Sequence, residues 1–239
     1  MPRTAHPALR LASAGTLSVA LVLPWLLAAE PTHTRQLQPQ DAGLVPVVGH
    51  WTPVQDEGAA LRADGERWTG QTPPEALATV ARSLFGAPSD RFVTNNGGAG
   101  AFPLAVWRPT ADFTGGTVRV RFKMLGGKTD QNAGIAFGLQ RSGRYWFMRY
   151  NTKDGDLALW RFANGERQLI VHGTGTSTLA LGRWHELVVT VRGRNLVASI
   201  TGDGAVSLAH TLDVAPTGRV GVWVKRDAIT AFRGFSQTP

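Results

Sequence analysis

Apolar and polar residues alternate along most of the chain after His50. The stretches "TVRVRFKML", "AGIAFGLQ", "HELVVTVRG" and "GRVGVWVKRD" place an apolar side chain at every second position. This period of two is typical of strands that are buried on one face. The core-facing residues expected from it are Val118, Val120, Phe122, Met124, Ile135, Phe137, Leu139, Leu187, Val189, Val191, Val220, Val222 and Val224. Such strands, joined by glycine and asparagine turns, predict an all-β fold of two packed antiparallel sheets.

One helix interrupts this pattern, in "TPPEALATVARSLFG". Thr72 is the expected N-cap, with Glu75 three residues later as in a capping box. Pro74 suits the first turn, and Gly86 can end the helix. Its apolar face is Leu77, Val80, Ala81, Leu84 and Phe85. We expect this short helix to pack over a sheet edge or an open end of the domain.

The N-terminus has a different character. Arg3 and Arg10 precede an apolar run that ends at Ala28 and Ala29, which predicts an export signal cleaved near Ala29. The alternative is an uncleaved anchor helix with its basic end inside. A periplasmic or secreted bacterial protein is therefore expected. The predicted organisation is a signal peptide or anchor at 1–29, a linker or irregular first edge at 30–49 and a β-sandwich at 50–239.

The cysteine count and the net charge limit the kinds of site and partner that this protein can have. The chain has no cysteine, which excludes a disulfide framework, a thiolate metal site and a cysteine nucleophile. The net charge of +8 comes mostly from scattered arginines. They can form a solvated surface, or they can attract anionic glycans or an anionic membrane. No nucleic-acid partner is expected, and a membrane contact is expected only through an uncleaved anchor.

The stretch "GRYWFMRYNTKDGDLALWRF" combines six aromatic residues with three arginines and an asparagine within one short segment. Alternation directs Trp146, Met148 and Tyr150 into the core. It directs Tyr145, Phe147, Arg149 and Asn151 to the opposite face, and Trp160 joins them if the strand register allows it.

Aromatic rings beside a guanidinium and an amide suit a saccharide. The rings stack on the C–H faces of a sugar, and the polar groups bond its hydroxyls. Alternatively, the rings and arginines cover one another.

These residues also carry a resemblance. The runs "YWFMRYNTKDGDLALWRFANGERQL", "GRWHELVVTVRG" and "GRVGVWVKRDAITAF" resemble exported bacterial concanavalin A-like domains, near the 3-keto-disaccharide hydrolase-like and laminin-G-like jelly rolls. The similarity covers roughly Trp51 to Phe235. The matching positions are Arg149 and Asn151, Asn164 and Gly165, Trp184, the turn residues Lys128, Asp130 and Gln131, and the closing residues Gly221, Trp223, Lys225 and Asp227. Val224, Arg226 and the "FRGF" ending depart from the family pattern.

The resemblance implies a jelly-roll fold and carbohydrate-related work in the cell envelope. Together with the aromatic strand, it favours an exported carbohydrate-binding sandwich without catalysis. The expected ligand-binding residues are Tyr145, Phe147, Arg149, Asn151, Trp160, Lys128, Asp130, Gln131, Trp223 and Lys225. The expected partner is a carbohydrate, including an anionic glycan.

Two alternatives stay open. One is a hydrolase or lyase acting on a 3-keto-disaccharide or glycoside, with Asp130, Glu186 or Asp227 as its base. No E-x-D-x-x-E run of the family 16 glycosidases is present, and the histidines show no metal-ligand spacing. The other alternative is a structural or adhesion module of the envelope. No cofactor is expected, although calcium could use turn aspartates. Those aspartates are Asp130, Asp154, Asp156 and Asp203.

Overall fold

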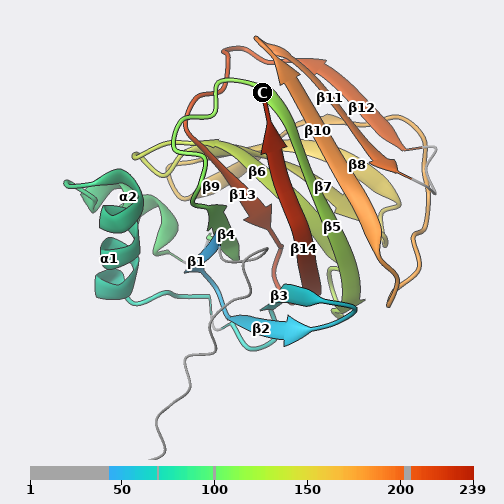
Figure 1. Ribbon diagram of the computed structural model, residues 1–239, viewed down its shortest axis with the longest axis horizontal. Coiled ribbons are helices and arrows are strands. Elements are labelled where there is room, and N and C mark those ends of the chain that lie inside the picture. The colour runs from blue at the N-terminus through green and yellow to red at the C-terminus, as the bar shows by residue number, and fades with distance from the viewer. Residues whose placement is uncertain (1–42, 69, 99–100, 202–205) are drawn as a thin grey trace, which may run out of the picture. The chain divides into compact units, whose positions relative to one another are not determined.

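Two antiparallel sheets of seven strands each build the molecule (Figure 1). The structure is a computed structural model that describes residues 43–68, 70–98, 101–201 and 206–239. Sheet A runs in the order β1 (Leu44–Val48), β4 (Leu104–Trp107), β13 (Arg219–Trp223), β6 (Asn132–Leu139), β7 (Tyr145–Asn151), β8 (Asp156–Ala163), β9 (Glu166–His172). Sheet B runs in the order β12 (Ser207–Thr211), β11 (Asn195–Thr201), β10 (His185–Arg192), β5 (Gly116–Gly126), β14 (Ile229–Thr238), β3 (Ala59–Asp64), β2 (Trp51–Gln55).

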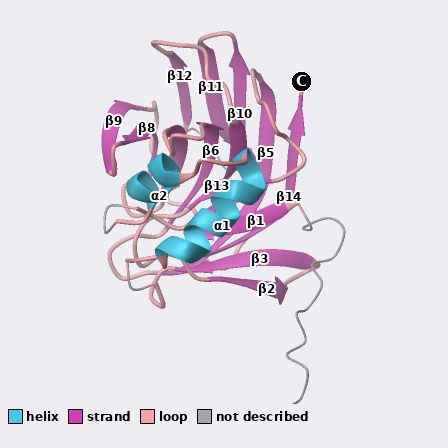
Figure 2. Ribbon diagram, turned by 90° about the vertical axis from the view of Figure 1, so that its left-hand side faces the viewer, coloured by secondary structure: helices cyan, strands magenta, loops and turns pink. Residues whose placement is uncertain are grey.

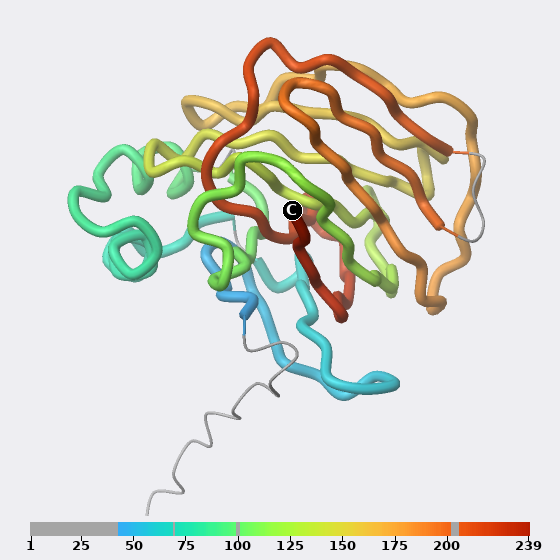
Figure 3. The backbone as a smooth tube through the Cα atoms, turned by 45° about the horizontal axis from the view of Figure 1, so that its top comes forward, coloured from blue at the N-terminus to red at the C-terminus, as the bar shows by residue number. Residues whose placement is uncertain are grey.

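The chain passes repeatedly between the two layers, as the backbone trace in Figure 3 shows. Strand β5 of sheet B is followed by β6 to β9 of sheet A, and the chain then returns to sheet B for β10 to β12. The last two strands, β13 and β14, belong to different sheets. Both sheets are therefore assembled from segments that lie far apart in the sequence. The predicted two-sheet antiparallel sandwich is confirmed.

The main core lies between the sheets and follows the predicted alternation. Apolar residues of β5 and β10 face residues of β6, β7 and β13 across it. Trp146, Met148 and Tyr150 lie in this core, as expected. Leu139 does not share the face of Ile135 and Phe137, however, and packs in a second cluster. Gly138 between them has φ +62°, so the strand changes face there.

A second apolar layer covers the outer face of sheet A. Helices α1 (Pro74–Phe85) and α2 (Asp90–Asn96) supply its cover, and both lie against the strands in Figure 2. Leu77, Ala81 and Leu84 of α1 and Phe92 of α2 are buried against this face. Helix α1 lies on this face over β1, the edge strand of sheet A, which agrees with the predicted position over a sheet edge.

The helix boundaries differ in detail from the prediction. The N-cap of α1 is Pro73 and makes no side-chain hydrogen bond, so the expected capping box of Thr72 and Glu75 is wrong. Pro74 begins the helix, where its missing N–H costs nothing. Gly86 ends it with φ +72°, as expected. Helix α2 was not predicted, because seven residues are too few to show a helical period.

The N-terminal expectations fall largely outside the described residues. The predicted signal or anchor at 1–29 lies there entirely. No helix among the described residues has the length and apolar character needed to cross a membrane. Sheet A already begins at Leu44, inside the segment expected to be a linker or irregular first edge. Strand β1 pairs there with β4, with an irregular register between Pro46 and Val48.

The packing of α1 on sheet A can be tested with a matched pair of leucines. Leu77→Ala should lower the free energy of unfolding by about 2–5 kcal/mol, because the Leu77 side chain is fully buried. Leu125→Ala is the control, since Leu125 is 40% exposed and its loss should change stability by less than about 0.5 kcal/mol. Urea denaturation measures both. Equal effects would contradict the packing of this helix.

Candidate functional site

Aromatic rings form a continuous layer on the outer face of sheet A. Phe147 of β7 pairs in register with Trp160 of β8, and their rings are nearly parallel at 6.2 Å. The Phe147 ring also stacks on Trp223 of β13 at 4.0 Å. Phe102, in the segment before β4, covers Trp223 at a centroid distance of 5.2 Å. The predicted shared face of Tyr145 and Phe147 is thus present, and Trp160 and Trp223 extend it.

This face is not open, and that prediction is wrong. Tyr145 is 1% exposed, and Phe147 and Trp223 are 0% exposed. Helices α1 and α2 and the segment containing Phe102 cover them. Alternation along a strand says which side chains share a face, but not what packs on that face. These three rings therefore cannot be platforms for a ligand, whereas Trp160 is only partly buried.

The polar part of the same face is also engaged internally. The Arg149 guanidinium is 4% exposed and donates to Asp154 at 2.9 Å and to Asp156 at 3.1 Å. The Asn151 amide, 2% exposed, donates to Asp154 at 2.8 Å. A ligand would have to displace these bonds to reach either residue. The expectation that Arg149 and Asn151 lie on an open surface is therefore wrong as well.

The expected turn residues gather beside them. Asp130 is 2% exposed and pairs with Lys225 at 2.8 Å. The Gln131 amide donates to the Gly127 carbonyl at 3.0 Å, so its side chain bonds its own loop. Lys128 lies exposed on the same turn. The structure thus brings Asp130, Lys225 and Asn151 together, with 3.5 Å between the Asn151 amide nitrogen and an Asp130 carboxylate oxygen.

Asp227 fastens this turn to the β13–β14 loop. Its carboxylate accepts the backbone N–H groups of Lys128, Thr129 and Asp130 at 2.6, 2.8 and 3.0 Å. Partial burial opposes ionisation of the carboxyl. The backbone hydrogen bonds outweigh this cost and hold the pKa of Asp227 below its usual value. A carboxylate with this environment is a structural anchor and a weak base.

The three candidate catalytic carboxylates do not converge. Glu186 lies on β10 of sheet B, where it contacts Arg119 at 3.7 Å and the Thr201 hydroxyl at 3.0 Å. Asp130 and Asp227 lie in the β5–β6 and β13–β14 loops, which join the two sheets, and both carboxylates are already engaged. Glu186 has its side-chain partners within sheet B instead.

The proposed calcium ligands show no cluster in the described residues. Asp154 and Asp156 both contact Arg149, and Asp156 also contacts His172 at 2.5 Å. No group of three or more acidic or histidine side chains suited to a metal ion occurs in residues 43–68, 70–98, 101–201 and 206–239. Asp203 lies outside those ranges.

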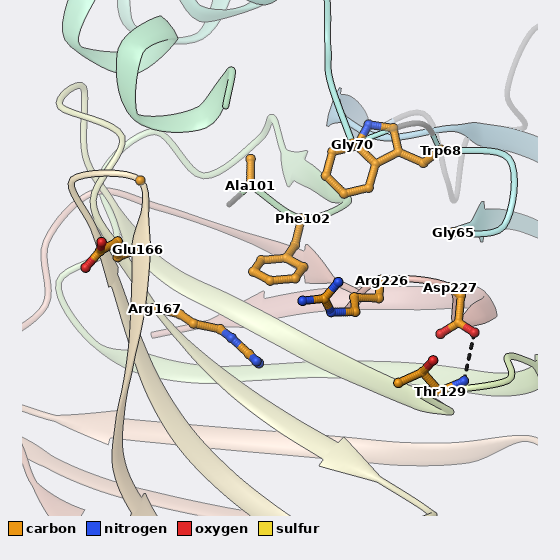
Figure 4. Close-up of a pocket in the computed structure, with 11 residues that line it drawn as sticks. Gly65, Trp68, Gly70, Ala101, Phe102, Thr129, Glu166, Arg167, Arg226 and Asp227 are labelled. Atoms are coloured by element: carbon orange, nitrogen blue, oxygen red, sulfur yellow. Dashed lines mark hydrogen bonds between the residues drawn. The ribbon is translucent and has the colours of Figure 1, made fainter. Parts of the chain in front are cut away.

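A pocket of roughly 630 Å³ lies on this face of sheet A (Figure 4). Its walls come from the segment after β3, the segment before β4, the β5–β6 turn, the β8–β9 turn with the start of β9, and the β13–β14 loop. The lining residues are Gly65, Trp68, Gly70, Ala101, Phe102, Thr129, Gly165, Glu166, Arg167, Arg226 and Asp227. The sequence had signalled three of these positions: Gly165 in the hairpin, Arg226 as a departure from the family pattern, and Asp227 as a closing residue and candidate base.

Close backbone packing holds one wall in place. A Cβ atom on Gly65 would lie 1.8 Å from the Arg226 carbonyl oxygen, so only glycine allows this approach. The Gly65 N–H donates to the Ala228 carbonyl at 3.0 Å. Arg226 itself has φ +41°, which is unusual for a residue with a side chain. Constrained backbone of this kind is often found at functional sites.

The pocket contains hydrogen-bond donors that the protein leaves unused. The Arg167 guanidinium lies 4.8 Å from the Trp160 ring and 5.3 Å from the Phe102 ring. Its Nη1 atom and the Trp68 indole nitrogen are buried and have no partner among the described residues. Buried polar groups are normally paired with protein, water or ligand. These donors, beside the Phe102 and Trp68 rings, therefore define the candidate binding site.

Comparisons with known proteins identify similar folds among solved structures. No protein-family model matches the sequence, and no curated protein matches it. The solved carbohydrate-binding module CBM66 from Bacillus subtilis is similar to this chain, with a TM-score of 0.57, 14% identity and coverage of 82% of this chain and 96% of the module. A likeness at this identity establishes the fold alone, which is a jelly-roll sandwich.

Two further solved structures match with lower TM-scores. The GH43 protein BlXynB (K247S mutant) from Bacillus licheniformis has a TM-score of 0.43 and 13% identity, covering 79% of this chain and 37% of that protein. A tetrameric galectin from the ball sponge Cinachyrella sp. has a TM-score of 0.41 and 12% identity, covering 53% and 94%.

The anchoring role of Asp227 predicts a specific pH dependence. Its folded-state pKa lies below the unfolded value of about 3.9, so its stabilisation is complete above about pH 5 and is lost as the pH falls below about 4. Asp227→Asn should lower stability at pH 7 by about 1 kcal/mol, because hydrogen bonds to a charged acceptor are lost. The difference from the unsubstituted protein should shrink towards pH 3.

Urea denaturation across this pH range measures the effect. Asp112→Asn is the control, because Asp112 is exposed and should behave like the unsubstituted protein. A constant difference at every pH would show that the Asp227 charge is unimportant.

Proposed function

We propose that this protein binds a saccharide in the pocket between Trp68, Phe102, Arg167 and Arg226. The observation that carries the proposal is the combination of aromatic rings and unpaired hydrogen-bond donors around one cavity. Its volume of roughly 630 Å³ lies within the range of small-ligand sites. The fold likeness to a carbohydrate-binding module supports the same class of ligand.

The chemistry of the pocket matches the two surfaces of a sugar. An aromatic ring offers an apolar face to the C–H groups of a pyranose or furanose ring. Trp68 is partly buried, so part of its indole is available to a ligand. The indole N–H and the Arg167 guanidinium can donate to hydroxyl oxygens. The rings first expected to stack, Tyr145, Phe147 and Trp223, instead form the packed layer beneath the site.

The proposal is for binding without hydrolysis. Glycoside hydrolysis normally uses two carboxyl groups, one on each side of the scissile bond. The carboxylates of the pocket are Glu166 and Asp227. Asp227 is occupied by backbone N–H groups, and its lowered pKa makes it a poor general acid. Glu166 lies at an exposed hairpin, and Asp227 does not supply the second carboxyl group that hydrolysis would need.

The proposal also places the protein outside the cytoplasm, in the periplasm or beyond. Support comes from the N-terminal sequence, where two arginines precede an apolar run that closes with Ala28 and Ala29.

Binding can be tested with a glycan array followed by calorimetry on the strongest ligand. Trp68→Ala should weaken binding at least tenfold, about 1.4 kcal/mol, because the stacking surface and the indole donor are lost. Trp51→Ala is the matched control, since Trp51 lies on β2 and packs against Phe232. It should change the melting temperature and leave the dissociation constant unchanged. An array without any signal would refute saccharide binding.

The export signal predicts a defined mature N-terminus. When the full chain is expressed in a Gram-negative host, the periplasmic fraction should contain protein that begins near Glu30. Intact-mass spectrometry of that fraction measures the cleavage. Substituting both Arg3 and Arg10 by Glu should leave the protein uncleaved in the cytoplasm, because the basic start of the signal is removed. Full-length protein in the membrane fraction would favour the anchor instead.

A further inference from the structure

Two guanidinium groups face the same part of the pocket. Arg167 extends from the start of β9, and Arg226 extends from the β13–β14 loop, with the Phe102 ring beside both (Figure 4). The close approach at Gly65 and the left-handed backbone of Arg226 fix the loop that carries the second guanidinium. The two positive groups are therefore held near one another by the fold.

No described carboxylate neutralises this pair. Neither Arg167 nor Arg226 forms an ion pair within the described residues, in contrast to Arg149, which contacts two aspartates. Asp227 is used by backbone N–H groups. Glu166 directs its carboxylate away from both arginines in Figure 4.

The charges nearest Arg167 also leave this pair of arginines without a neutralising carboxylate. Burial and the positive charge of Arg149 lower the pKa of Arg167, Arg226 adds to this effect, and Asp130 opposes it. Asp130 is already paired with Lys225. Positive charge thus exceeds negative charge at the centre of the pocket, although placing like charges together without a counter-ion is unfavourable.

A second hollow continues the basic surface. It has a volume of roughly 480 Å³ and shares Glu166 and Arg167 with the first pocket. Arg161 of β8 and Arg144, which directly precedes β7, also line it. Arg167 therefore lies between two adjoining hollows, which together can hold more than one sugar unit.

The geometry points to an acidic saccharide as the ligand, with Arg167 and Arg226 binding its anionic group. This inference rests on the proposed saccharide binding and adds the charge of the sugar. An arginine fork matches the planar oxygens of a carboxylate and also binds sulfate. An anion between the two guanidiniums would supply both the missing counter-charge and the partner that Arg167 Nη1 lacks. The remaining sugar surface would lie against Phe102 and Trp68.

Calorimetric titration with matched acidic and neutral saccharides tests this inference. The probes are oligomers of polygalacturonate, alginate and a sulfated galactan, each beside its carboxyl-reduced or desulfated form. At least one acidic probe should bind, and its neutral form should bind at least tenfold more weakly. Carboxylated and sulfated probes separate the two sources of negative charge. Affinity should fall as salt is raised, because an ionic contact is screened.

Charge-matched variants show whether the two arginines carry the effect. Arg226→Gln and Arg167→Gln should each weaken binding of the acidic probe at least tenfold and leave binding of its neutral form within about twofold. Arg119→Gln removes the same charge from the outer face of sheet B, where Arg119 contacts Glu186, and should leave both affinities unchanged. Arg226 is exposed, so its variant keeps the test valid if Arg167→Gln fails to fold.

The outcomes distinguish this inference from the proposed function. Equal binding of acidic and neutral probes would overturn the charge preference and leave saccharide binding intact. Weaker binding of Arg119→Gln by the same factor would show general attraction to a basic protein and would also overturn it. No binding of any probe, acidic or neutral, would refute both.

Discussion

The stacking of Phe102 and Phe147 on Trp223 is the contact on which the rest of this structure depends. It joins the segment before β4 to the outer face of sheet A. The three rings belong to the second hydrophobic layer on that face, and Phe102 also lines the pocket above it. Aromatic pairs of this kind combine large buried area with a preferred geometry. The candidate site therefore has a rigid, apolar floor beneath its polar walls.

The polar residues near this floor fall into two groups, those bonded to one another and those that line the pocket. Arg149 and Asn151 are bonded to Asp154, and Asp130 is paired with Lys225, beside the aromatic layer. Internal pairs of this kind hold their side chains in place. The Asp227 carboxylate adds to this rigidity by holding the β5–β6 turn to the β13–β14 loop. The unpaired Arg167 Nη1 and Trp68 indole nitrogen belong to residues that line the pocket.

The candidate site lies on sheet A, where strands and connecting segments have different roles. Strands fix the floor, and five connecting segments build the walls, which is how loops on a rigid scaffold usually carry function. Because the walls come from separate parts of the chain, their composition can change without disturbing the sheets. The fold is thus compatible with many ligands.

The sequence by itself determined the period-two strands, the helix at 74–85 and the shared face of Tyr145, Phe147, Arg149 and Asn151. These features follow from local alternation and turn chemistry, which neighbouring residues encode. It did not determine what covers that face, since the cover comes from helices and from Phe102, distant in the chain. Arg167 and Arg226 are likewise far apart in the sequence, and they come together only because the chain returns to sheet A after crossing to sheet B. Burial and convergence are properties of long-range packing, so only the tertiary structure decided where a ligand has room to bind.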